Sequence, residues 1–127
     1  MITKTRGIVL RSVRFGESSL IVDVLTELSG RVSFVVRIPK TSKGKVKKQY
    51  FQPMTLLDFE YDFRQRSSLQ HIKDVRIAQP YSSIPCNPVK SSVLLFLAEF
   101  LYYTTRDEQE NSTLFNYISA SLEWFDS

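Results

Sequence analysis

Residues 31–48 read RVSFVVRIPKTSKGKVKK and contain the clearest strand of the sequence followed by its most basic segment. Successive side chains of a β-strand point to opposite faces, and one face of residues 32–38 is wholly apolar. Its inward residues are Val32, Phe34, Val36 and Ile38, and its outward residues are Arg31, Ser33, Val35 and Arg37. Pro39 ends the strand because proline cannot donate a ladder hydrogen bond. We therefore predict a strand with one buried face that leads directly into a basic loop.

Four further segments have the periodicity of strands, namely residues 7–15, 20–25, 55–63 and 69–77. Gly16 and Gly30 mark turns on either side of the second of these segments. In the last segment the apolar positions change parity between Leu69 and Ile72, which predicts a bulge there. Five short antiparallel strands in about 75 residues fit a small closed barrel, because closure removes exposed sheet edges. An oligonucleotide-binding (OB) barrel is the prediction, and an SH3-like barrel is the alternative that strand pattern leaves open.

Residues 55–63 combine an aromatic inner face with an acidic outer face. The predicted inward residues are Thr55, Leu57, Phe59, Tyr61 and Phe63, and the outward ones are Asp58, Glu60 and Asp62. Three carboxylates on one strand face could hold a divalent cation. The simpler interpretation is a solvated strand face that pairs with nearby Arg or Lys. We expect no metal site and no cofactor.

The last third of the sequence has helical character. Asn87 is a good N-cap, Pro88 suits the first helical position, and every residue of 93–103 except Glu99 is apolar or aromatic. A second helix is expected from Asn111 or Ser112. We predict a mainly β chain with C-terminal helices, divided into a barrel (1–79), a proline-rich linker (80–88) and the first helices of an incomplete helical domain (89–127). The sequence is therefore expected to be part of a longer chain.

Charge is concentrated in the basic loop. The chain has 17 Lys and Arg against 13 Asp and Glu, and residues 37–48 contribute six of the basic residues and none of the acidic ones. Without that loop the chain would be net acidic. A partner with many regularly spaced negative charges, such as a nucleic-acid backbone, is the natural candidate. A solvated lysine loop that serves solubility is the alternative on charge alone.

Several classes of function are not favoured by the sequence. The lone Cys86 can form no intrachain disulfide, which favours a reducing compartment. The N-terminus lacks the apolar core of a signal peptide, and the apolar run of 93–103 is too short to span a bilayer. We expect a cytoplasmic protein without membrane contact. The four scattered glycines form no phosphate cradle, and His71 has no positioned nucleophile beside it, so we expect no enzyme.

The candidate nucleic-acid contacts lie near the end of the strand at 7–15, on the outer face of the third strand and in the basic loop that follows it. They are Arg14, Arg31, Arg37, Lys40, Lys43, Lys45, Lys47 and Lys48. Most aromatic residues fall on predicted inner faces, and Phe15, Tyr50 and Phe51 are the plausible exposed ones for stacking on bases. With so few stacking groups, binding is expected to be mainly electrostatic.

Several ordered motifs of the first 80 residues resemble the N-terminal barrel of the RecO family of bacterial recombination mediators. They are Thr5-x-Gly7-Ile8-Val9-Leu10, Phe15-Gly16-Glu17, Leu20-Ile21-Val22, Leu25-Thr26, Gly30-Arg31, the basic loop, Gln52-Pro53, Leu57-Asp58-Phe59-Glu60-Tyr61 and Leu69. The resemblance implies an OB fold, binding of single- and double-stranded DNA, and strand annealing. It also implies loading of RecA onto DNA coated by single-stranded-DNA-binding protein, with RecR as partner, and no catalysis. By position, the family's binding surface falls on Arg37 and the lysines from Lys40 to Lys48.

The sequence departs from the family pattern in two places. The cysteine zinc site that many members carry in their helical domain has no counterpart here. The segment after the strand at 32–38, often rich in glycine and arginine in the family, reads Ile38-Pro39 followed by lysines. Lysine keeps phosphate contacts but loses the bidentate contacts of arginine.

We therefore interpret the sequence as part of a DNA-binding recombination mediator. Two other classes stay open. One is a protein-interaction module that docks through its apolar helices, and the other is an RNA-binding OB domain.

Overall fold

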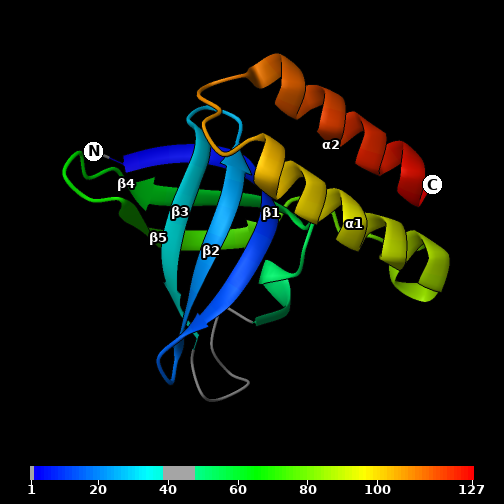
Figure 1. Ribbon diagram of the computed structural model, residues 1–127, viewed down its shortest axis with the longest axis horizontal. Helices are drawn as coiled ribbons and strands as arrows, with labels where there is room; N and C mark the ends of the chain where they lie inside the picture. The colour runs from blue at the N-terminus through cyan, green and yellow to red at the C-terminus, as the bar shows by residue number, and fades with distance from the viewer. Residues whose placement is uncertain (1, 39–47) are drawn as a thin grey trace.

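The computed structural model describes residues 2–38 and 48–127 (Figure 1). Five strands are followed by two α-helices, and two short 3₁₀ helices lie in the connections. The strands are β1 (Ile2–Phe15), β2 (Ser19–Thr26), β3 (Gly30–Arg37), β4 (Leu56–Asp62) and β5 (Leu69–Ile77). The helices are η1 (Lys48–Phe51), η2 (Ile84–Cys86), α1 (Pro88–Thr104) and α2 (Ser112–Asp126). The predicted mainly β fold with C-terminal helices is confirmed.

The strands form a closed barrel in the order β1-β2-β3-β5-β4, and β4 returns to β1. All neighbours are antiparallel except β3 and β5, which run parallel with Ser33 opposite Leu69 and Val35 opposite His71. The prediction that all strands are antiparallel is wrong at this pair, because β4 crosses to the far side of β1 and leaves β3 to pair with β5. A closed five-stranded barrel with this crossover is an OB fold, which decides against the SH3-like alternative.

Strand β1 takes part in both halves of the barrel. Residues 2–8 pair with β4 and residues 7–15 pair with β2. A bulge lies between Val9 and Arg11, so that Leu10 and Arg11 are successive residues on the outer side. At the crossing point, a Cβ on Gly7 would lie 2.4 Å from a methyl group of Val24. The close approach of the two sheet halves therefore requires glycine at this position.

The barrel interior is filled by aromatic and β-branched side chains. Phe34 packs edge-on against Phe59 and Tyr61, with ring centroids 5.2 and 5.1 Å apart. The predicted inward faces of β3 and β4 are confirmed, with one exception. Phe63 lies beyond the end of β4 and is 51% exposed.

A second apolar core joins the outside of the barrel to the helices. Its members are Ile8, Leu10, Leu25, Met54 and Leu56 from the barrel and Ile84, Leu94, Ala98, Phe115 and Leu122 from the helical part. Figure 1 shows α1 lying across the barrel with α2 beside it. Arg6 adds a polar contact, since it pairs with Glu27 at 3.0 Å and donates to the side-chain oxygen of Asn116 of α2 at 3.1 Å.

The segment predicted as a linker is held in place by the end of α2. The Asp126 carboxylate accepts backbone N–H bonds from Ser82, Ser83 and Ile84, each at 2.9 Å. Burial disfavours the charged carboxylate, but these donors outweigh burial and lower the pKa of Asp126. Asn87 caps α1 as predicted, accepting from the N–H of Val89 at 3.0 Å.

The outer face of β4 is an ion-paired, solvated surface. Asp58 pairs with Arg76 at 2.9 Å and Glu60 pairs with Lys4 at 3.4 Å, which confirms the simpler interpretation of the acidic stripe. The bulge predicted in β5 lies instead at Lys73, where Glu60 faces Asp74 and Tyr61 faces Ile72. Within residues 2–38 and 48–127, no helix is both long and apolar enough to cross a membrane.

Candidate nucleic-acid interface

Three of the predicted contact residues gather at one end of the barrel. Arg14 is opposite Leu20 in the β1–β2 ladder, one residue before β1 ends. Lys48 begins η1, which is attached to β1 by a hydrogen bond of 2.6 Å from Ser12 Oγ to the Phe51 carbonyl. Two pockets of about 250 and 340 Å³ both have Arg14, Leu20 and Lys48 in their walls. The cations of β1 and η1 thus border the same hollows.

Arg37 belongs to the same barrel end. It is opposite Ser19 in the β2–β3 ladder and is exposed. The next residue, Ile38, donates its N–H to the Ser18 carbonyl at 2.7 Å, which fixes the end of β3 to the β1–β2 turn. Ile38 and Lys48 both line the smaller pocket, so the flanks of the basic segment meet there. Lys40, Lys43, Lys45 and Lys47 lie outside the described residues.

The three cations differ from other cations of the barrel in their surroundings. Arg6, Arg76 and Lys4 each face a carboxylate. Arg14, Arg37 and Lys48 make no ion pair with any residue that the structure describes. Among the described residues that line the smaller pocket, Glu17 in the β1–β2 turn is the acidic one. This barrel end is a surface of positive charge that an anion can approach.

Arg31 is placed differently from the other predicted contacts. Its side chain is only 9% exposed and lies under the C-terminal end of α1. It donates to the Tyr102 carbonyl at 2.7 Å and lies 3.9 Å from the Asp23 carboxylate. The prediction that it faces outward from the barrel is correct, but α1 covers that part of the face.

The three candidate stacking residues differ in how exposed their side chains are. Phe15 is 55% exposed at the end of β1. Tyr50 is half-buried and packs against the barrel core. The expectation that Phe51 is exposed is wrong, since it is 2% exposed. Its ring fills the end of the barrel because η1 turns inward over Ser12.

The outer face of the first three strands carries an apolar row that the sequence reasoning did not identify. Val13, Ile21 and Val35 are cross-strand neighbours, and His71 of β5 continues the row. Val13 is 42% exposed. The alternation in residues 32–38 already placed Val35 outward, but Val13 and Ile21 could be aligned with it only from the register.

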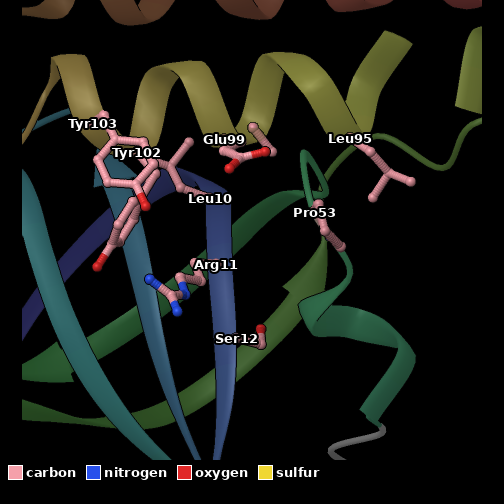
Figure 2. Close-up of a pocket in the computed structure, with 9 residues that line it drawn as sticks. Leu10, Arg11, Ser12, Pro53, Leu95, Glu99, Tyr102 and Tyr103 are labelled. Atoms are coloured by element: carbon pink, nitrogen blue, oxygen red, sulfur yellow. The ribbon is translucent and has the colours of Figure 1, made fainter. Parts of the chain in front are cut away.

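A further pocket, of about 320 Å³, lies between β1 and α1 (Figure 2). Figure 2 shows Tyr102 and Tyr103 extending from α1 toward the strand that carries Arg11. The guanidinium carbon of Arg11 lies 4.9 Å from the centroid of the Tyr102 ring, and Glu99 is in the same wall. This wall holds one cation and one carboxylate, whereas each barrel-end pocket holds both Arg14 and Lys48 against at most one carboxylate, Glu17, among the described residues. The barrel end is therefore the more suitable anion site.

The fold and the barrel end define the class, which is an OB-barrel protein with helices packed on its side and, at one end, cations that form no ion pair with any described residue. Residues 1–81 match the model of the family described as "Recombination protein O N terminal". The chain therefore belongs to the RecO family.

Its relatives include the DNA repair protein RecO of Bacteroides fragilis, which is 47% identical over all 127 residues, 52% of that protein. The DNA repair protein RecO of Phocaeicola vulgatus is 44% identical over 126 residues, which cover 99% of this chain and 52% of the relative. That of Flavobacterium psychrophilum is 34% identical over 125 residues, covering 98% of this chain and 52% of the relative. The chain thus spans about half the length of the curated relatives it matches.

Proposed function

We propose that this chain is the DNA-binding part of a recombination mediator in DNA repair. The observation that carries the proposal is the meeting of Arg14, Arg37 and Lys48, without carboxylate partners among the described residues, at the barrel end where the flanks of the lysine segment converge. The relatives' names add support, since each is a DNA repair protein. No catalytic step is part of this role.

The chemistry of the cations indicates what they would contact. Lysine ammonium groups act as point charges and hold phosphates without reading bases. We therefore propose a phosphate grip that tolerates any sequence, on single strands and duplexes alike, formed by Arg14, Arg37, Lys48 and the lysines at 40, 43, 45 and 47. Arg31 is left out of this set because its guanidinium is engaged with α1 and Asp23.

The finer steps of mediation follow from the family resemblance. A surface that neutralises phosphates lowers the repulsion between two strands, which suits annealing. We propose that the chain acts within a longer protein that works with RecR and single-stranded-DNA-binding protein and helps load RecA. We also propose that residues 89–127 begin a helical domain after a connection at 80–88. The shared core with the barrel 1–79 would make that domain a packed neighbour.

Charge reversal tests the proposal directly. Fluorescence anisotropy would measure the affinity of the Arg37→Glu, Lys48→Glu double variant for a labelled single strand and a duplex. The control is Lys4→Glu, Lys73→Glu, which changes the net charge equally on other parts of the barrel. We expect the first pair to weaken binding at least tenfold and the control pair to have little effect. Equal weakening by both pairs, or none by either, would contradict the proposed site.

One observation favours an additional role in protein binding. Phe96 and Phe100 of α1 and Tyr117 and Trp124 of α2 are exposed aromatic side chains. If charge reversal leaves DNA binding intact, this helical surface becomes the leading functional site. Competition between single-stranded DNA and RNA would separate the DNA role from an RNA-binding one.

A further inference from the structure

Ser12 is a polar residue at a position of the barrel where an apolar one is expected. It is opposite Val22 in the β1–β2 ladder, and Val22 is opposite Phe34 in the β2–β3 ladder. Residues directly opposite each other share a face of the sheet, and both Val22 and Phe34 are fully buried in the barrel core. A hydroxyl group on this inner face needs a hydrogen-bond partner, and Ser12 has its partner outside the strands.

The partner of Ser12 is η1, the short 3₁₀ helix that begins at Lys48. Ser12 Oγ donates a hydrogen bond of 2.6 Å to the carbonyl oxygen of Phe51, which is the last residue of η1. The final carbonyls of a helix have no donor within the helix, and the serine supplies one. Among the described residues, this is the one hydrogen bond that joins η1 to a strand of the barrel.

The hydrogen bond gives η1 an orientation that apolar packing alone does not supply. The Phe51 ring is 2% exposed, and Tyr50 packs against the same core. Burial of these rings holds η1 against the barrel, but the hydrophobic effect has no preferred direction. A hydrogen bond weakens steeply as its angle departs from linearity. The bond from Ser12 therefore restricts how η1 is turned relative to β1.

The orientation of η1 determines the spacing of two cations. Ser12 and Arg14 are alternate residues of β1 and lie on the same side of that strand. Arg14 and Lys48 line the same two pockets, and Ser12 is in the wall of the larger one. Arg37, in contrast, is placed by its pairing with Ser19 in the β2–β3 ladder. Its position is independent of η1.

We infer that Ser12 is a positioning residue of the proposed phosphate grip, whose hydroxyl holds η1 so that Lys48 lies beside Arg14 before DNA is bound. This inference rests on the proposed function and adds a residue that acts without touching DNA. A group that is already held in its bound position loses less conformational freedom on binding. Loss of the Ser12 hydroxyl therefore weakens binding through Lys48 and leaves the contribution of Arg37 unchanged.

A double-mutant cycle between Ser12 and Lys48 tests the inference. Fluorescence anisotropy would measure the affinity of Ser12→Ala, Lys48→Gln and the double variant for a labelled single strand. We expect Ser12→Ala to weaken binding about fivefold, the size of one neutral hydrogen bond. It should have no further effect once Lys48 is replaced. In the matched cycle with Arg37→Gln, the effects of the two substitutions should add.

Further variants separate positioning from general stability. Ser12→Thr keeps the hydroxyl and should keep the affinity of the unchanged protein. Ser33→Ala removes another strand hydroxyl, which donates to the Asp23 carboxylate, and should lower stability in urea denaturation without changing affinity for DNA. If Ser12→Ala does not fold, Ser12→Cys replaces it in the cycle, because a thiol is a weaker donor of similar shape.

The outcomes of the inference and of the proposed function can be told apart. Unchanged affinity in Ser12→Ala, or an equal loss of affinity with and without Lys48, would overturn the inference and leave the phosphate grip intact. Loss of affinity in Ser33→Ala equal to that in Ser12→Ala would overturn it as well. Undiminished binding in both Lys48→Gln and Arg37→Gln would contradict the proposed function, and the inference with it.

Discussion

Arg31 donates a hydrogen bond of 2.7 Å to the carbonyl oxygen of Tyr102, and its guanidinium carbon lies 4.5 Å from the centroid of the Tyr102 ring. A second bond, of 3.4 Å, reaches the hydroxyl oxygen of Thr105. A cation at the C-terminal end of a helix is favourable because the last carbonyls there lack intrahelical donors. Arg31 therefore links β3 to the C-terminal end of α1, and its positive charge interacts with groups of the protein itself.

Arg31→Gln should destabilise the protein without weakening DNA binding by the folded form. Loss of charged hydrogen bonds should lower the free energy of unfolding by about 2 kcal/mol, measured by urea denaturation. Arg37→Gln should give the opposite pattern, with unchanged stability and weaker DNA binding. A selective loss of DNA affinity in Arg31→Gln would contradict the structural role.

Salt dependence should report the number of phosphates that the barrel end holds. Each of Arg14→Gln, Arg37→Gln and Lys48→Gln should lower the slope of log affinity against log salt by up to about 0.7 on a single strand. Arg76→Gln is the control, because Arg76 already pairs with Asp58 and should leave the slope unchanged. Anisotropy titrations at several salt concentrations would measure the slopes, and slopes unchanged in all four variants would exclude these cations from the interface.

Gly30→Ala should cost more stability than Gly16→Ala. Both glycines have a positive φ, +68° and +70°, so alanine at either position adds about 1–2 kcal/mol of backbone strain. At Gly30 the new Cβ would also lie 2.3 Å from the Glu108 carbonyl oxygen, whereas nothing lies within 4 Å at Gly16. Thermal unfolding of the two variants would measure the difference. Equal losses of stability in the two variants would indicate that the connection between α1 and α2 shifts away from the new Cβ at little energetic cost.

The stabilising effect of Asp126 should depend on pH. Its pKa is lowered in the folded protein, so the carboxylate stabilises the fold above its unfolded pKa, near 4, and this contribution is lost as the pH falls through the folded pKa. Asp126→Asn should lower the melting temperature at pH 7, because its amide group cannot accept all the N–H bonds from 82–84. The difference from the unchanged protein should shrink below about pH 4. A difference that is independent of pH would contradict this account.

Much of the barrel could be predicted because its strands alternate cleanly. Phe34, Phe59 and Tyr61 fell on the correct inner faces, and Asn87 and Pro88 marked the start of α1. The parallel β3–β5 pair could not be predicted, since periodicity says which face a residue takes and nothing of which strand lies beside it. Phe51 and Phe63 were misplaced for a related reason. Phe51 ends η1 and Phe63 directly follows β4, and outside the strands the local chain direction decides which side chain is buried.

The candidate site, like the barrel, could be predicted only in part. The charge of residues 37–48 indicated Arg37 and Lys48, and the end of the first predicted strand indicated Arg14. The different position of Arg31 depends on α1, which begins more than 50 residues later in the sequence. The apolar row of Val13, Ile21 and Val35 depends on strand register, because the three residues belong to different strands. Long-range packing, which no local pattern contains, accounts for both.

The parallel pairing of β3 with β5 also bears on the order of events during synthesis. Strands β1, β2 and β3 can form a sheet as soon as they leave the ribosome, since their connections are short turns. The sheet cannot close until β5 has followed, because β5 supplies the partner for β3 and β4 alone binds only to β1. Until then β3 has an unpaired edge, and such edges favour association with other chains. In the interval between the emergence of Arg37 and that of Ile77 from the ribosome, a nascent chain is therefore exposed to misassembly through this edge.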